Sequence, residues 1–412
     1  MTLILTNIRI MKKVAVIFLI LLMYTECNSN KNSQPAGASN SPSPEKEISA
    51  PQLLTGAAQL DLLVPKLKNK SVALVVNYTA TVGKTHLADT LKSYGVKIKK
   101  IMSPEHGFRG TATAGEHVKD GFDTKTGLPV VSLYGNNRKP TAAQMQDVDV
   151  LIFDIQDVGI RFFTYVGTLH YVMEACAENG KKLIVLDRPD PHGSYVDGPV
   201  LLPKFKSFIG MHPVPIVHGL TIGEYAQMIN GEGWLEGKKK CELEIITLKN
   251  WTHADEYSLP LKPSPNLPND QAIKLYPSVC FFEGTPLSLG RGTMMPFQVL
   301  GHPDLKNMPF QFTPVDVPGM SVDPPLENKL CYGLDLREVA VPKKVDLHYL
   351  IDMYKAFPDK EKFFVPNFSR WAGNEVLAQQ IKDGLTEEQI RESWQAELSA
   401  YKEIRKKYLL YQ

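Results

Sequence analysis

The segment VKIKKIMSPEHGFRG, residues 96–110, joins a strand pattern to a loop that is rich in reactive side chains. Residues 96–101 alternate between apolar and basic side chains, which predicts a β-strand. Pro104 and Gly107 interrupt that pattern, so we expect the strand to run directly into a tight loop. The loop carries a carboxylate, an imidazole and a guanidinium on Glu105, His106 and Arg109. Because open α/β sheets bind ligands at the carboxyl ends of their strands, this loop is the first candidate for a functional site.

Strand and helix patterns alternate on either side of this segment. Apolar runs at residues 71–77, 148–154 and 182–187 predict strands that are buried on both faces, and residues 128–134 and 242–248 predict two more. Helical patterns lie between them, at residues 85–94, 141–146, 163–179 and 221–228. Gly180 is placed to end one of these helices, and Thr221 with Glu224 forms a capping box for another. Such alternation predicts an α/β fold with a Rossmann-like, mostly parallel sheet.

Several classes of function lack their usual signals. The chain contains neither a GxGxxG nor a GxxxxGK[ST] motif, so no nucleotide cofactor is expected. The formal net charge is only +2, which gives no reason to expect a nucleic-acid partner. The five cysteines have no CxxC spacing, so neither a zinc site nor a redox site is predicted. We therefore expect an enzyme without a metal or a cofactor, or a binding protein.

The amino-terminal residues predict export. Lys12 and Lys13 precede an apolar run at residues 14–23, which is too short to span a bilayer comfortably and is typical of a signal peptide. Cys27 stands where a bacterial lipoprotein carries its lipidated cysteine; the alternative is simple cleavage nearby. We assign residues 1–27 to this signal and residues 28–50, which are rich in Asn, Ser and Pro, to a disordered tether. The expected location is the periplasm or the outer membrane, with membrane contact only through a lipid anchor.

The composition and the pattern of the sequence change after Trp251. Prolines crowd residues 260–268, and Gly290 and Gly292 flank Arg291, which suggests a backbone held close to a ligand or to the first domain. Residues 373–411 have an amphipathic helical pattern. We therefore expect a Rossmann-like catalytic domain at residues 51–250 and a smaller α+β auxiliary domain at residues 251–412, with a cleft between them.

Polar side chains follow four of the predicted strands. The strand-end residues are Asn77, Glu105, His106, Asp154, Asp157, Asp187 and Arg188, with Arg161 shortly after one of them. Because parallel strands end at one edge of their sheet, the pattern predicts an active site along that edge. Two alternatives remain: the aspartates could be metal ligands, although no histidine completes a usual set, and the arginines could be their structural partners.

Six ordered motifs resemble one bacterial family. They are SPEHGFRG (residues 103–110), FDIQDVG (153–159), LDRP (186–189), HGLTIGE (218–224), PSPNLP (263–268) and EGT through GRGT (283–293). Together they resemble the NamZ-type exo-β-N-acetylmuramidases from about residue 60 to the carboxyl terminus. The resemblance implies a peptidoglycan-recycling glycosidase that removes terminal N-acetylmuramic acid (MurNAc) from the non-reducing end of fragments such as MurNAc-GlcNAc. It also implies a Rossmann-like catalytic domain and a carboxyl-terminal auxiliary domain.

The chemistry of glycoside cleavage then assigns roles. The reaction needs an acid on the leaving oxygen and a negative group near the anomeric carbon. We expect Glu105 to be the acid, with His106 orienting it or sharing its proton. The second group is Asp157 or Asp154, with Glu116 in reserve, unless the 2-acetamido group of the substrate takes that role.

Substrate contacts are expected from a further set of residues. The lactyl carboxylate of MurNAc needs a cation, for which the candidates are Arg188, Arg161 and Arg291. The remaining candidates for substrate binding are Asn77, at a strand end, and Asn266 and Glu283 in the family motifs. Two rival functions remain: a non-catalytic, lipid-anchored glycan-binding protein and a metal-dependent hydrolase on the same scaffold.

Overall fold

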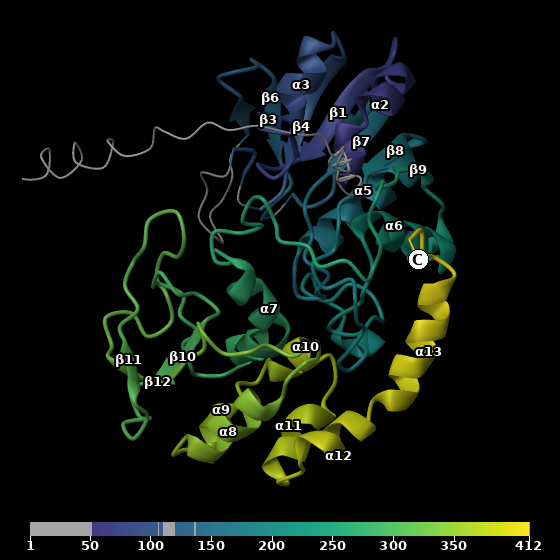
Figure 1. Cartoon of the computed structure of the whole chain (residues 1–412). Coiled ribbons are helices and arrows are strands. Elements are labelled where there is room, and N and C mark those ends of the chain that lie inside the picture. Colours follow the sequence, from purple (N-terminus) through teal and green to yellow (C-terminus); the bar gives the residue numbers. More distant parts are fainter. Residues whose placement is uncertain (1–51, 106, 110–119, 136, 412) are drawn as a thin grey trace, which may run out of the picture. The chain divides into compact units, whose positions relative to one another are not determined.

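A seven-stranded sheet organises the first half of the protein (Figure 1). Its strand order is β5-β6-β4-β1-β7-β8-β9, and every neighbouring pair is parallel except β5 with β6. The strands are β1 (Ser71–Val76), β4 (Lys97–Ser103), β5 (Gly121–Phe122), β6 (Pro129–Ser132), β7 (Val150–Asp154), β8 (Lys182–Leu186) and β9 (Glu242–Ile246). The computed structural model describes residues 52–411 apart from residues 106, 110–119 and 136. The prediction of a mostly parallel α/β sheet is confirmed.

Both faces of the sheet are covered by helices. In β1, Ala73 and Val75 pack in the hydrophobic cluster that contains α5 (Tyr165–Asn179) and α6 (Ile222–Gly231). The alternate residues Val72 and Leu74 pack on the other face with α2 (Leu60–Lys66) and α3 (Leu87–Ser93). Because successive side chains of a strand point to opposite faces, an unbroken apolar run is what a doubly covered strand requires.

The helix boundaries follow local signals. Gly180 ends α5 in the left-handed conformation with φ of 59°, and Thr221 and Glu224 form the predicted capping box at the start of α6. A second capping box, formed by Thr141 and Gln144, begins α4 (Ala142–Met145). The helix predicted at residues 85–94 begins at Leu87, because the two preceding residues form β3 (Thr85–His86) and pair with β2 (Thr81–Val82). Short 3₁₀ turns lie at Gly56–Ala58, Pro203–Phe205 and Glu236–Lys238.

The second half contains a small antiparallel sheet and seven helices among its described residues. The sheet has the order β10 (Val299–His302), β12 (Cys331–Asp335), β11 (Phe310–Phe312). The helices are α7 (Asp270–Val279), α8 (His348–Ala356), α9 (Lys360–Phe363), α10 (Phe368–Ala372), α11 (Val376–Lys382), α12 (Glu387–Glu392) and α13 (Gln395–Lys406), with a 3₁₀ helix, η4 (Cys280–Gly284), after α7. The amphipathic pattern over residues 373–411 is therefore divided into three helices, and Gly384, with φ of 77°, separates the first two.

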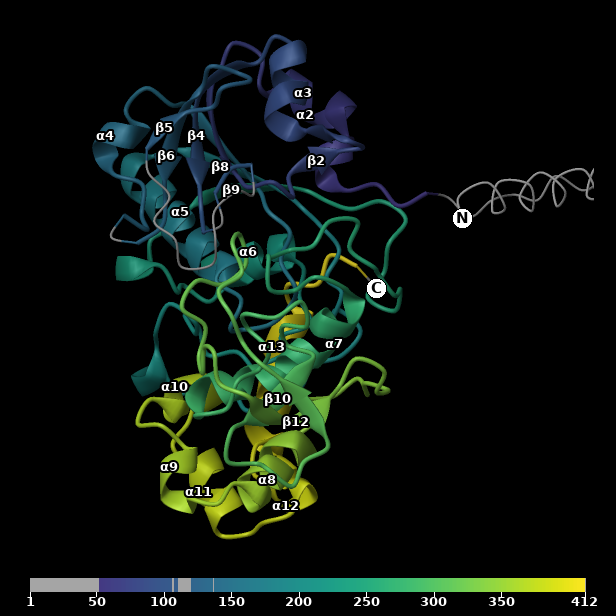
Figure 2. The same cartoon turned by 90° about the vertical axis from the view of Figure 1, so that its left-hand side faces the viewer.

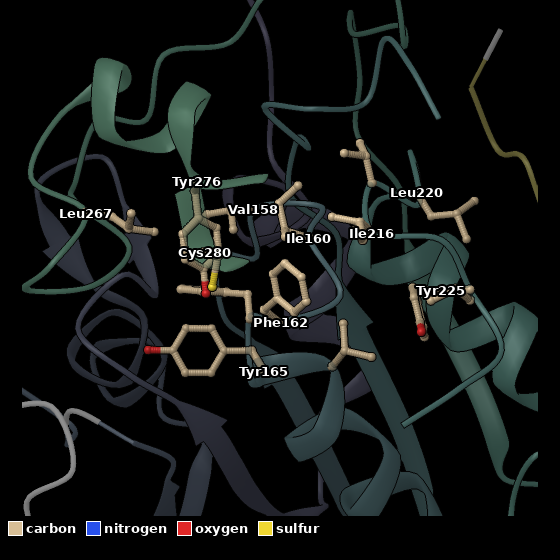
Figure 3. Packing of buried hydrophobic residues seen from close by; sticks show 14 of the residues in the cluster. Val158, Ile160, Phe162, Tyr165, Ile216, Leu220, Tyr225, Leu267, Tyr276 and Cys280 are labelled. Carbon is tan, nitrogen blue, oxygen red and sulfur yellow. The ribbon is translucent and has the colours of Figure 1, made fainter. Parts of the chain in front are cut away.

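The two halves share a hydrophobic core. One cluster of buried side chains runs from Ala73 in β1 to Tyr401 in α13. Figure 3 shows its centre, where Phe162 lies beside Tyr276 and Cys280 from the second half. The end of the chain also returns to the sheet (Figures 1 and 2): the Tyr411 hydroxyl donates a hydrogen bond of 2.5 Å to Asp187, directly after β8.

Two negative findings concern the residues described. No helix there is long and apolar enough to cross a membrane. Cys176, which lies in α5, and Cys241, Cys280 and Cys331 are all buried and free of disulfides.

Candidate active site

The loop after β4 is held at both ends, and Glu105 lies between the fixed points. The Gly107 amide donates to the Pro104 carbonyl at 3.2 Å, and Gly107 has φ of 73°, a conformation that favours glycine. Phe108 is buried edge-to-face against His86, with ring centroids 4.5 Å apart. Arg109 then pairs with Asp89 of α3 and with Asp123 after β5. The reactive part of the loop therefore has a rigid support.

Two hydroxyl groups orient the Glu105 carboxylate. The Tyr134 phenol donates to Oε1 at 3.0 Å, and the Thr164 hydroxyl donates to Oε2 at 3.1 Å. Thr164 is the residue before α5, but its side chain makes no capping bond to that helix. Burial raises the pKa of Tyr134 to about 12, and the neighbouring charge of Glu105 adds to the shift. The phenol therefore stays a hydrogen-bond donor throughout the physiological pH range.

Glu105 lines a cavity of about 340 Å³ that contains side chains from both halves of the chain. Phe162 and Phe163 contribute from the first half, and Tyr276 and Trp371 contribute from the second. Phe162 packs edge-to-face on Tyr276 at 6.5 Å and lies 5.6 Å from Trp371, measured between ring centroids. This volume is near the lower end of the range for small-molecule sites, and aromatic walls suit the apolar faces of a sugar ring.

Glu283 and Arg291 are the other predicted site residues that line this cavity. They pair with each other, and Arg291 Nε donates to Glu283 Oε1 at 2.7 Å. The Arg291 guanidinium also lies over the Phe297 ring, 5.0 Å from its centroid. The structure thus brings Glu105, Glu283 and Arg291 to one cavity.

Asp154 and Arg188 lie elsewhere and form a buried ion pair. Arg188 donates to the two carboxylate oxygens of Asp154 at 2.5 and 3.0 Å, and both side chains are at most 5% exposed. Neither residue lines the cavity. In this pair, Arg188 is the structural partner of Asp154, as in one of the two alternatives that the sequence left open.

Asp157 is buried without a cationic partner among the residues that the structure describes. Its Oδ2 accepts the Gly159 amide at 2.8 Å and lies 3.9 Å from Nε2 of His218, while Oδ1 has no hydrogen-bond partner. Burial raises the pKa of Asp157 to about 7 and lowers the pKa of His218 to about 3. Gly159 has φ of 75°, and a Cβ there would lie 2.1 Å from Oδ1 of the buried Asp190. Asp157 therefore belongs to a packed interior turn and does not line the cavity.

Arg161 also has an internal role. Its guanidinium donates to the carbonyls of Pro199 and Val214 in the first half, at 2.8 and 3.1 Å, and to those of Trp371 and Ala372 in α10, at 3.0 and 3.1 Å. Burial lowers its pKa to about 9. Arg161 therefore connects two parts of the chain that lie 210 residues apart.

Asn77 and Asn266 do not line the cavity, but they hold residues that do. The amide nitrogen of Asn77 donates to the hydroxyl of Tyr165, which lines the cavity, at 2.8 Å. The amide nitrogen of Asn266 donates to the Met320 carbonyl at 2.9 Å and fixes the loop that carries Ser264 at the cavity wall. His106 and Glu116, the remaining predicted residues, lie outside the described residues.

One group of three acidic side chains within the described part of the chain has metal-ligand spacing, namely Glu174, Glu178 and Glu236. Lys139 already pairs with Glu174 and Glu178, at 3.1 and 2.7 Å. None of these residues lines the cavity that contains Glu105. The cavity has no such ligand set among the residues described.

Comparison with known proteins identifies the family. The model for the amino-terminal part of the exo-β-N-acetylmuramidase NamZ matches residues 72–271, and the model for its carboxyl-terminal part matches residues 274–411. The chain belongs to the NamZ family. It is therefore a glycoside hydrolase by family, and the resemblance drawn from the six motifs is confirmed.

The NamZ relatives include a characterised protein and two solved structures. The peptidoglycan β-N-acetylmuramidase NamZ of Bacillus subtilis (strain 168) is 36% identical over 401 residues, which cover 91% of this chain and 95% of that protein. Two crystal structures of DUF1343 family proteins from Bacteroides fragilis NCTC 9343 share the fold. The first is 45% identical with a TM-score of 0.82, and the match covers 88% of this chain and 99% of that chain. The second is 28% identical with a TM-score of 0.75, and the match covers 87% of this chain and 99% of that chain.

Sequence reasoning missed several residues of this NamZ-family cavity, among them Tyr134, Arg138, Thr164 and Trp371. Tyr134 ends the predicted strand at residues 128–134, Arg138 follows it, and Thr164 falls at the start of the predicted helix at residues 163–179. Their positions next to element ends were a usable signal, because the other candidates were chosen in that way. Trp371 had no such signal, because α10 reaches the cavity only through tertiary packing.

Proposed function

We propose that this chain is an exo-acting β-N-acetylmuramidase. It hydrolyses terminal N-acetylmuramic acid from the non-reducing end of peptidoglycan fragments and serves cell-wall turnover and recycling. Family membership and the identity to a named peptidoglycan β-N-acetylmuramidase support this reaction. The small volume of the cavity supports exo action, because it suits one sugar residue better than a continuous glycan strand.

The observation that carries the proposal is the position of Glu105. Its carboxyl group lies in the cavity, held by Tyr134 and Thr164 in one orientation. General acid catalysis needs such a group within hydrogen-bond reach of the leaving oxygen. In the proposed reaction, Glu105 gives a proton to the glycosidic oxygen as the bond to the anomeric carbon breaks, and water completes the hydrolysis.

The geometry reduces the number of candidates for the group that stabilises the anomeric carbon. Asp154 and Asp157 do not line the cavity, whereas Glu283 does. The described residues therefore offer Glu283, already paired with Arg291, beside the 2-acetamido group that the substrate itself brings.

The test uses two substrates with the purified protein. One is the disaccharide MurNAc-GlcNAc, and the other is a chromogenic MurNAc glycoside. Release of free MurNAc from both is the expected result. A protein that binds MurNAc-GlcNAc without releasing MurNAc would instead be the non-catalytic glycan-binding protein, and activity that is lost with EDTA and restored by a metal would indicate the metal-dependent hydrolase.

The proposed location is the periplasm or the outer membrane, through a lipid on Cys27. This proposal rests on the basic and apolar pattern of residues 12–23 and on the position of Cys27 after it. Replacing Cys27 with Ser removes the acceptor, so the variant should move from the membrane fraction to the soluble fraction when cells are fractionated. Equal partitioning of Cys27→Ser and the parent would contradict the anchor.

A further inference from the structure

Two arginines line the cavity that contains Glu105, and they differ in their partners. Arg291 is neutralised by Glu283 at 2.7 Å. Arg138 is exposed, and its Nε donates only to the Gly135 carbonyl at 3.2 Å. Within the described residues, no carboxylate lies within ion-pair distance of Arg138. Arg138 is therefore the cavity cation whose charge is still available to an anionic ligand.

The Arg138 side chain is held in place by an aromatic platform. Its guanidinium lies over the Phe208 ring, 4.2 Å from the centroid. Phe208 in turn stacks on Tyr171 of α5, with an interplanar angle of 15°. Gly167 of the same helix permits this approach, since a Cβ at that position would lie 2.8 Å from the Phe208 ring. A guanidinium fixed by its face presents its edge, which is the part that binds a carboxylate in bidentate fashion.

Arg138 lines the same cavity as the acid, Glu105. The Tyr134 phenol, four residues before Arg138 in the chain, lines this cavity as well. That phenol donates directly to Glu105. The lactyl group of MurNAc is attached two ring carbons away from the anomeric carbon. A MurNAc residue with its glycosidic oxygen at Glu105 therefore places its lactyl carboxylate within this cavity, where the carboxylate needs a cation as its partner.

We propose that Arg138 pairs with the lactyl carboxylate of the bound sugar and sets the preference for MurNAc over GlcNAc. This inference rests on the proposed function for the identity of the sugar. It replaces the three arginines expected from the sequence, because Arg188 and Arg161 are committed to internal bonds and Arg291 is paired with Glu283.

The experiment removes the carboxylate charge from the substrate and, separately, the guanidinium charge from the enzyme. The substrates are 4-nitrophenyl MurNAc and its lactyl amide, which differ only in the carboxylate. The enzymes are the parent, Arg138→Gln, Arg291→Gln and the matched control Arg337→Gln; Arg337 is an exposed arginine that pairs with Asp335 and does not line the cavity. We expect the parent and Arg337→Gln to prefer the acid over the amide in kcat/KM by about 30- to 150-fold, as one charge-assisted pair would give. Arg138→Gln should prefer it by less than about threefold.

The outcomes separate this inference from the proposed function. If Arg138→Gln keeps the preference of the parent, or if Arg291→Gln alone abolishes it, the assignment to Arg138 is overturned while the muramidase stands. If the parent cleaves neither substrate, the proposed function fails, and calorimetric binding of free MurNAc and its lactyl amide decides the inference. If the parent binds MurNAc more tightly than the lactyl amide and Arg138→Gln does not, the inference is supported. If Arg138→Gln keeps this preference, or if the parent shows no preference, the inference is overturned.

Discussion

Glu105 is placed to supply a proton, and a single substitution tests that role. Glu105→Gln keeps the shape of the side chain and one acceptor oxygen, for either Tyr134 or Thr164, but removes the proton. We expect kcat on MurNAc-GlcNAc to fall by about 10²- to 10⁴-fold, as is usual for loss of a general acid, with little change in binding. A nitrophenyl aglycone needs little protonation, so its first step should be slowed far less.

The comparison of the two leaving groups decides between roles for Glu105. Steady-state kinetics on both substrates, with the thermal stability of the variant as a check on folding, give the measurement. An equally severe loss on both substrates would make Glu105 a nucleophile or a charge stabiliser. A small loss on both would move the chemistry to another group, and Glu283 is the next described carboxylate to test.

Strand-end position alone could not separate site residues from structural ones. Glu105, Asp154 and Asp187 all lie at the carboxyl ends of parallel strands of one sheet, yet Asp154 and Asp187 are fully buried. Asp187 accepts hydrogen bonds from Thr221 and from Tyr411, which is 224 residues further along the chain. A partner so distant leaves no local pattern, so strand-end position favoured Asp154 and Asp187 as much as Glu105 and could not show that Glu105 alone of the three lines the cavity.

At the scale of elements, Arg109 holds the loop after β4 against two neighbouring segments. It donates to Asp123 at 2.8 Å and to Asp89 of α3 at 3.2 Å. Burial raises the pKa of both acids, but the hydrogen bonds and the charge of Arg109, together with Lys125 at Asp89 and Thr126 at Asp123, outweigh burial and hold each pKa below its usual value. This contribution to stability is complete above the unfolded pKa of an aspartate, about 3.9, and is lost as the pH falls through the lower folded values.

Arg109→Met should therefore destabilise the protein at pH 7 and displace Glu105. We expect a loss of roughly 2–3 kcal/mol in the free energy of unfolding, together with lower kcat. The deficit relative to the parent should shrink as the pH falls below about 4. Lys125→Met is the matched control, because Lys125 pairs with the same Asp89 but is mostly exposed, and it should cost at most about 1 kcal/mol. Urea unfolding at pH 7 and pH 3.5 measures both; a deficit independent of pH would contradict the ion-pair account.

Element boundaries were predictable where a local signal exists. The Thr221 capping box and the left-handed Gly180 mark their helix ends in the sequence and in the structure. The second half was harder, because α7 contains Pro277 and follows a proline-rich loop, and α7 is buried in the hydrophobic cluster that both halves share. Its helices are also short, and short helices depend on tertiary packing more than on their own propensity.

At the scale of the whole molecule, the cavity depends on how the two halves are held together. Trp371 of α10 and Phe162 of the first half meet at its wall, with ring centroids 5.6 Å apart. Arg161 fixes this arrangement through four carbonyls, two in each half. Gly373 follows α10 with φ of 79°, and a Cβ there would lie 2.7 Å from the Arg161 guanidinium. The packing around this one side chain is therefore tight.

Arg161→Met tests whether that connection sustains both stability and the cavity. Methionine fills part of the space but donates no hydrogen bonds, so four buried carbonyls lose a donor. We expect the free energy of unfolding to fall by roughly 2–4 kcal/mol, and KM for the chromogenic MurNAc glycoside to rise more than kcat falls, since Trp371 is displaced from the cavity wall. Arg337→Met removes an exposed pair and should cost at most about 1 kcal/mol with unchanged kinetics. Urea unfolding and steady-state kinetics on both variants give the comparison. If Arg161→Met behaves like Arg337→Met in both measurements, the halves are held by their shared aromatic core alone.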